Sequence, residues 1–102
     1  NEPCDHFPVM THEVKLTEMT REANKRFFSS IDEVPTAAIT MGIGTVMAAR
    51  KIVMIITGAD KAEILHKVFF GPATPEVPGS ILQFHHDVTL ICDEAAAARM
   101  PQ

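Results

Sequence analysis

The chain has 102 residues, of which 46% are hydrophobic and 22% charged, with a formal net charge of −4 and a pI near 5.6. This composition is typical of one small globular domain, and the acidic balance argues against nucleic acid as a partner. No apolar run approaches the ~20 residues that a membrane-spanning helix needs, so we expect no membrane partner either.

The first stretch, NEPCDHFP, begins with Asn1, and neither a Met start nor a secretory cleavage site explains Asn1-Glu2-Pro3. Residues 1–11 contain two prolines and no hydrophobic period, so they are predicted to form a loop. We expect this loop to be internal to a longer protein, an active-site loop whose upstream part is missing. Residues 13–17 (EVKLT) alternate apolar and polar side chains, which predicts a short strand.

A helix is predicted to follow, over the sequence EMTREANKRFFSS. Thr17 suits its N-cap, and Glu18 falls in the first turn. Met19, Ala23 and Phe27 recur at the spacing of one helical stripe, which we expect to pack on a core.

Two strands are predicted next, at residues 37–41 (AAITM) and 51–57 (KIVMIIT), with helix beginning around Thr45 between them. The second run is β-branched and apolar without alternation. That pattern is typical of a strand covered on both faces, in a parallel sheet with helices on either side.

A second helix is predicted to begin with a capping box, in which Asp60 is the N-cap and Glu63 the third helical residue. Its apolar stripe comprises Ala62, Leu65, Val68 and Phe69, and Gly71 is predicted to end it.

Beyond residue 71, Ser80 is predicted to cap a short helix, residues 88–92 (VTLIC) to form a buried strand, and DEAAAARM to start a last helix. The alternation of strands and helices predicts an α/β fold with a mainly parallel, open sheet. No repeat or linker interrupts it, so residues 1–102 are predicted to be a single unit.

Ligands of open parallel sheets lie at the strand-to-helix turns, and two such turns stand out: TMGIGT and TGADK. Lys61 opens a helix, where its charge faces the positive end of the dipole unless an anion lies between them. A solvated surface lysine explains Lys61 equally well, and the two glycines of GIG suit close packing as well as ligand approach. Arg26 is either a rim residue packed on the core or a bidentate phosphate clamp.

The histidines and cysteines show no metal-ligand spacing. His85 and His86 are sequence neighbours, whose side chains point in different directions in a regular element. We therefore expect no metal site. Cys4 and Cys92 form no CxxC pattern, which favours a reducing, cytoplasmic setting with Cys92 as a buried thiol.

Four stretches in series resemble the carboxy-terminal portion of the glucosamine-6-phosphate deaminase (isomerase) family. They are NEP, TREANKRFF, VPTAAITMGIGTVMAARKIVMIITGADKA and PGSILQFHHDVTLICDEAA, and together they run from residue 1 to about 97. The resemblance implies a Rossmann-like sheet, a sugar-phosphate substrate and acid–base chemistry with no cofactor. It also implies that Glu2 belongs to the ring-opening group and that Arg26 and Lys61 bind the substrate phosphate. The family's catalytic aspartates and histidine have no counterpart among these residues.

The chain departs from the family pattern just after NEP. Asp5, His12 and Val14 stand where small or basic residues of regulated members would bind an allosteric sugar phosphate, and Lys15 is the only nearby cation. We therefore expect this allosteric site to be absent. Homo-oligomerisation, or association with the missing amino-terminal portion, is implied by the resemblance.

Two functions of different class remain open. The first is the deaminase, and the second is a sugar-phosphate-binding effector domain of a transcription regulator. An intact NEP motif and the absence of a helix-turn-helix pattern favour the enzyme. The sequence does not discriminate glucosamine from galactosamine phosphates.

Overall fold

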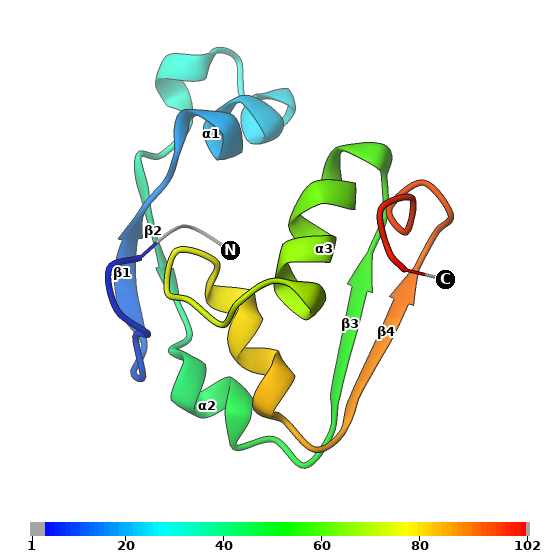
Figure 1. Cartoon of the computed structure of the whole chain (residues 1–102). Helices are drawn as coiled ribbons and strands as arrows, with labels where there is room; N and C mark the ends of the chain where they lie inside the picture. The colour runs from blue at the N-terminus through cyan, green and yellow to red at the C-terminus, as the bar shows by residue number, and fades with distance from the viewer. Residues whose placement is uncertain (1–3, 102) are drawn as a thin grey trace.

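The computed structural model describes residues 4–101 and shows a mixed α/β chain (Figure 1). Its regular strands and helices, in chain order, are β1 (His12–Lys15), α1 (Glu18–Asn24), β2 (Ala37–Thr40), α2 (Ile43–Met47), β3 (Ile52–Ile56), α3 (Ala62–Phe70) and β4 (Val88–Cys92). Short 3-10 helices cover Lys25–Phe27, Ile31–Glu33, Ala59–Lys61 and Pro78–Phe84. The two ribbons β1–β2 and β3–β4 stand apart, with α3 and the Pro78–Phe84 helix between them.

The strand predicted at residues 37–41 does not join the predicted parallel sheet, and this expectation is wrong for the chain. β2 pairs antiparallel with β1, with His12 opposite Thr40 and Lys15 opposite Ala37. A parallel crossover needs a dozen or more residues, whereas residues 41–51 alone separate β2 from β3. β2 pairs instead with the polar, alternating segment His12–Lys15.

The strands β3 and β4 do form the predicted parallel pair, with Ile52 opposite Val88 and Ile56 opposite Cys92. The α3 and Pro78–Phe84 helices make the crossover between them (Figure 1). Only one face of this pair is covered. Val53, Ile55 and Ile91 are 53%, 71% and 53% exposed, so the expectation of a strand covered on both faces is wrong within these residues.

The core lies where α3 packs on the Pro78–Phe84 helix. Leu65 is fully buried, and Ala62 and Val68 are buried beside it, as their predicted stripe requires, while Phe69 is half-buried. Gly71 ends α3 as predicted. The Gln83 amide donates to the carbonyls of Val68 and Gly71, at 2.8 and 2.9 Å, and so satisfies groups that the helix end leaves unpaired.

Two predicted helix caps and one predicted helix are wrong. Asp60 caps nothing, because it lies inside the Ala59–Lys61 turn and α3 begins only at Ala62, without a side-chain cap. Ser80 is a buried residue within the Pro78–Phe84 helix; its hydroxyl donates to the Thr74 carbonyl and accepts from the Thr74 amide. The DEAAAARM stretch forms turns in place of a helix.

The cap at the start of α1 is confirmed, since the Thr17 hydroxyl accepts from the Thr20 amide at 3.3 Å. The stripe on α1 is not buried: Met19 is 83% and Phe27 67% exposed. Cys92, expected to be a buried thiol, is half-buried and forms no disulfide.

Candidate functional site

The carboxyl ends of β3 and β4 lie side by side (Figure 1), and Lys61 ends the Ala59–Lys61 turn that follows β3. Gly58 starts this turn with φ 100°, a conformation that L side chains rarely adopt. Its carbonyl accepts from the Lys61 amide at 3.1 Å. The sequence TGADK therefore folds as a tight turn that leads directly into α3.

The Lys61 side chain is exposed at the start of α3. Within residues 4–101, no acidic side chain forms an ion pair with it. A cation at the positive end of a helix dipole is unfavourable until an anion binds between them. The geometry therefore retains the feature that made Lys61 a candidate for phosphate binding.

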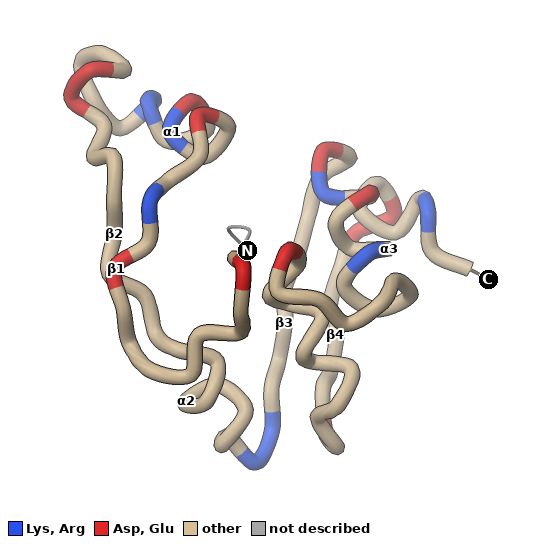
Figure 2. Tube along the Cα trace, turned by 60° about the vertical axis from the view of Figure 1, so that its left-hand side comes forward, with Lys and Arg blue, Asp and Glu red and all other residues tan. Residues whose placement is uncertain are grey.

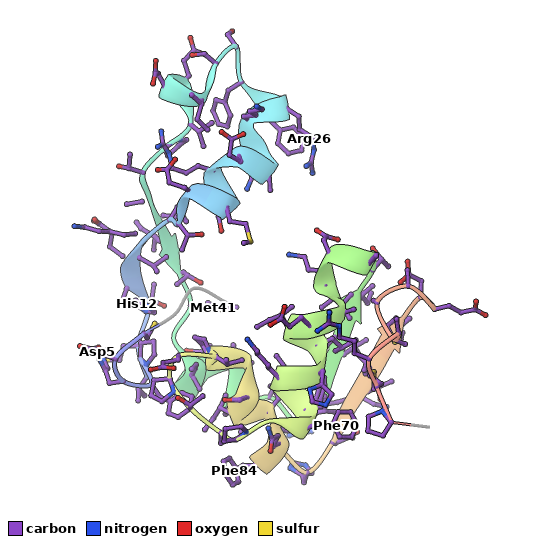
Figure 3. All side chains as sticks on the ribbon, turned by 45° about the horizontal axis from the view of Figure 1, so that its top comes forward. Asp5, His12, Arg26, Met41, Phe70 and Phe84 are labelled. Atoms are coloured by element: carbon purple, nitrogen blue, oxygen red, sulfur yellow. The ribbon has the colours of Figure 1, made fainter. Side chains whose placement is uncertain are left out.

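Arg26 lies in the Lys25–Phe27 turn that follows α1, and its side chain projects from that turn (Figure 3). The guanidinium lies 4.5 Å from the Phe27 ring centroid, and its Nη1 donates to the Ala23 carbonyl at 2.5 Å. Stacking and this hydrogen bond orient the group. Because a guanidinium carries several N–H donors, others stay available to an anion.

No hydrogen bond or ion pair in the described part of the chain joins Arg26 and Lys61. Arg26 follows α1 and Lys61 directly precedes α3, and these two helices stand apart in both views (Figures 1 and 2). Their convergence on one phosphate remains a prediction.

Glu2 lies outside the described residues, but the loop that follows it is anchored. The Cys4 amide donates to the Pro75 carbonyl at 2.9 Å. The carbonyls of Pro8 and Val9 accept from the amides of Ile43 and Gly44, at 2.7 and 3.0 Å. The loop is thereby tied to the start of α2.

The glycines of the GIG motif serve this packing. A Cβ placed on Gly42 would lie 2.1 Å from the Val9 carbonyl oxygen, and one on Gly44 would lie 2.6 Å from the Val9 side chain. Only hydrogen fits at either position. Of the two interpretations left open by the sequence, close packing is therefore the one that the structure supports.

The loop after NEP also carries the residues with which the chain departs from the family pattern. Residues 4–6 and 8–15 line an open concavity of about 670 Å³, and Lys15 is the only lysine or arginine among its lining residues. The Asp5 carboxylate lies 2.5 Å from the His6 ring, and this hydrogen bond lowers the pKa of Asp5. A negative charge at Asp5 disfavours an anionic effector here, so absence of the allosteric site remains our expectation.

Asp93 is a polar contributor that the sequence did not single out. Its carboxylate accepts from the Gly58 amide, 3.2 Å from each oxygen, and from the Ala96 amide at 2.8 Å. The available signal was its position directly after a buried strand that is predicted to lie beside the strand of TGADK.

Residues 4–101 contain neither a cluster of metal ligands nor a membrane-spanning helix. No three His, Cys, Asp or Glu side chains gather closely enough there to hold a metal ion. None of the helices in the same range is long and apolar enough to span a bilayer.

Comparisons with known proteins, by family, by sequence and by structure, agree on one family. The family described as glucosamine-6-phosphate isomerases/6-phosphogluconolactonase matches residues 7–91. The glucosamine-6-phosphate deaminase of Lachnoclostridium phytofermentans is 55% identical over 92 residues, which are 90% of this chain and 39% of that protein. The deaminase of Streptococcus thermophilus is 54% identical over 100 residues, which are 98% of this chain and 43% of that protein.

A solved structure of a monomeric glucosamine-6-phosphate deaminase of the NagB superfamily superposes with a TM-score of 0.88 at 44% identity. The match covers 95% of this chain and 40% of that structure. The chain thus spans about two fifths of the length of the relatives it matches.

Proposed function

The chain belongs to the family of glucosamine-6-phosphate isomerases and 6-phosphogluconolactonases, and we propose that it forms part of a glucosamine-6-phosphate deaminase. The observation that carries this proposal is its 54–55% identity to curated deaminases over 90–98% of its own length. These relatives are enzymes by name, which favours catalysis over a sensor role. The proposed reaction converts glucosamine 6-phosphate and water to fructose 6-phosphate and ammonia.

The reaction needs proton transfers and phosphate binding, and this chain would supply part of each. The sugar ring opens, a proton moves from C2 to C1 to give an imine at C2, and water hydrolyses this C=N bond to leave the C2 ketone and release ammonia. We propose that Glu2 acts in ring opening, by orienting the group that handles the ring-oxygen proton. The proton-transferring aspartates would come from the remaining part of the enzyme.

We propose that Arg26 and Lys61 bind the substrate phosphate. The exposed Lys61 ammonium, without an acidic partner in the described chain, and the oriented Arg26 guanidinium are supporting observations. A guanidinium fork and an ammonium at a helix start both suit a phosphate monoester. The two segments would have to approach each other in the complete enzyme.

We further propose that residues 1–102 are a single unit within a larger, mainly parallel Rossmann-like sheet. The parallel β3–β4 pair would be its contribution, with the rest of the protein covering the exposed face that contains Val53, Ile55 and Ile91. Association with an amino-terminal portion, or with further copies, and a cytoplasmic location belong to the same proposal.

The test is a chimaera in which this chain replaces the matching 100 residues of the Streptococcus thermophilus deaminase. We expect the chimaera to release ammonia and fructose 6-phosphate from glucosamine 6-phosphate. The parent enzyme is the positive control, and a Glu2→Gln chimaera is the matched control. A folded chimaera that binds the substrate without any turnover would favour the sensor instead.

A further inference from the structure

Asp93 connects the turns that follow β3 and β4. It is the first residue after β4, and both of its carboxylate oxygens lie 3.2 Å from the amide nitrogen of Gly58, in the turn after β3. The Oδ1 of Asp93 also accepts from the Ala96 amide at 2.8 Å, and this hydrogen bond closes the turn after β4. Figure 1 shows this turn beside the carboxyl end of β3.

The backbone of Gly58 connects Asp93 to Lys61. Its N–H, in the peptide unit with Thr57, donates to Asp93, while its carbonyl, in the peptide unit with Ala59, accepts from the Lys61 amide at 3.1 Å. Glycine has the widest choice of backbone conformations, so its own sterics do not hold φ at 100°. The two hydrogen bonds hold the peptide units on either side of the Gly58 Cα, so a change in φ would move the backbone of Lys61.

We propose that Asp93 is a positioning residue for Lys61, and that it fixes the turn from which Lys61 meets the phosphate monoester of a sugar. This inference rests on the proposed function. A carboxylate near a phosphate site repels the ligand by its charge. The benefit of Asp93 is therefore geometric: it supplies an acceptor oxygen in the right place.

Three substitutions separate geometry from charge. Asp93→Ala removes the acceptor. Asp93→Asn keeps Oδ1, which serves both Gly58 and Ala96, but removes the charge. Asp93→Glu keeps the charge but displaces the oxygens by one methylene, and Glu94→Ala is the control, because Glu94 is the adjacent exposed carboxylate.

The first measurement is amide hydrogen exchange in the 15N-labelled 102-residue chain. We expect exchange at Gly58 to accelerate roughly threefold to tenfold in the Ala and Glu variants, as for loss of one hydrogen bond. It should stay within about twofold of the unaltered chain in the Asn variant and in the control. Unchanged exchange at Gly58 in the Ala and Glu variants would overturn the inference.

The second measurement is the Michaelis constant of the chimaera for glucosamine 6-phosphate, because the proposed phosphate site needs the complete enzyme. We expect this constant to rise at least about threefold in the Ala and Glu variants and to be restored by Asn. Faster exchange with an unchanged Michaelis constant would mean that Asp93 only stabilises the turn, which also overturns the inference. If Lys61→Ala itself leaves the Michaelis constant unchanged, the proposed phosphate-binding role fails, and the positioning role fails with it.

Discussion

Arg26 and Lys61 differ in the contacts that their charged groups already make. The guanidinium of Arg26 stacks on Phe27 and donates to the Ala23 carbonyl, whereas Lys61 extends from a turn with no ion-pair partner in the described chain. Removing Lys61 would therefore delete a charge and little else. Removing Arg26 would also uncover one face of Phe27.

We predict that Lys61→Ala and Arg26→Ala each weaken sugar-phosphate binding in the chimaera. Loss of a charged, desolvated contact is expected to cost about 2 kcal/mol, which corresponds to a Michaelis constant about 30-fold higher. Lys25→Ala is the matched control, because Lys25 already pairs with Glu22 at 3.0 Å. Michaelis constants that stay unchanged in both variants would refute the phosphate site.

Gly42 is the residue at which one added methyl group should lower the free energy of unfolding most. Its Cβ would overlap the Val9 backbone, so we predict that Gly42→Ala displaces the loop after NEP and lowers the free energy of unfolding by about 1–3 kcal/mol. Thr45→Ala, at an exposed position of the same helix, should change it by less than about 0.5 kcal/mol. Urea denaturation measures both, and equal stability of the two variants would contradict the packing role of Gly42.

At the scale of elements, local signals predicted the existence of strands and helices better than their partners. The apolar run of β3, the stripe of α3 and the Thr17 cap are local features, and the structure contains all three. The partner of β2 depends on the length of the connection that follows it and on the competing segment β1. Neither factor can be recognised in the sequence of β2 itself. The role of Asp93 depends on two strands becoming neighbours, so it could not be read from its own surroundings.

We predict that Leu65→Ala destabilises the chain by about 2–5 kcal/mol, because Leu65, on α3, is fully buried. The exposed pair of Glu63 and Lys67, 3.1 Å apart on the same helix, provides the contrast. Lys67 lowers the pKa of Glu63, so the contribution of the pair is present at neutral pH and is lost as the pH falls through the lowered pKa. For an exposed pair this loss is small.

Glu63→Gln should therefore leave the unfolding midpoint at pH 7 nearly unchanged, while Leu65→Ala lowers it strongly. Thermal unfolding followed by circular dichroism measures both. A larger effect for Glu63→Gln than for Leu65→Ala would show that the core has been assigned to the wrong side of α3.

At the scale of the whole molecule, one face of β3–β4 is uncovered in a chain that spans about two fifths of the length of its relatives. Val53 and Ile55 point to the same side as Ile91, which lies opposite Ile55 in the parallel register. The β3 sequence alone predicted a strand with two covered faces. The cover for the second face is absent from these residues, which is why this prediction failed for the chain but still suits a larger sheet.

We predict that the isolated chain self-associates through this face. Replacing Val53, Ile55 and Ile91 together by threonine keeps the β-branched shape while adding hydroxyl groups. Sedimentation should then show a shift toward monomer, with the circular dichroism spectrum retained. Association of equal strength in the triple variant would place the contact elsewhere on the chain.

Ammonia release tests the central claim most directly, that these residues supply the phosphate-binding part and one catalytic carboxylate of a deaminase but not the whole active site. Proton transfer needs heavy atoms held within ~3 Å of each other, and the groups that would accompany Glu2 are not in this sequence. We expect no ammonia from glucosamine 6-phosphate with the 102-residue chain alone, and turnover once the remaining part of the Streptococcus thermophilus deaminase is supplied. Turnover by the isolated chain that disappears in Glu2→Gln would contradict the account.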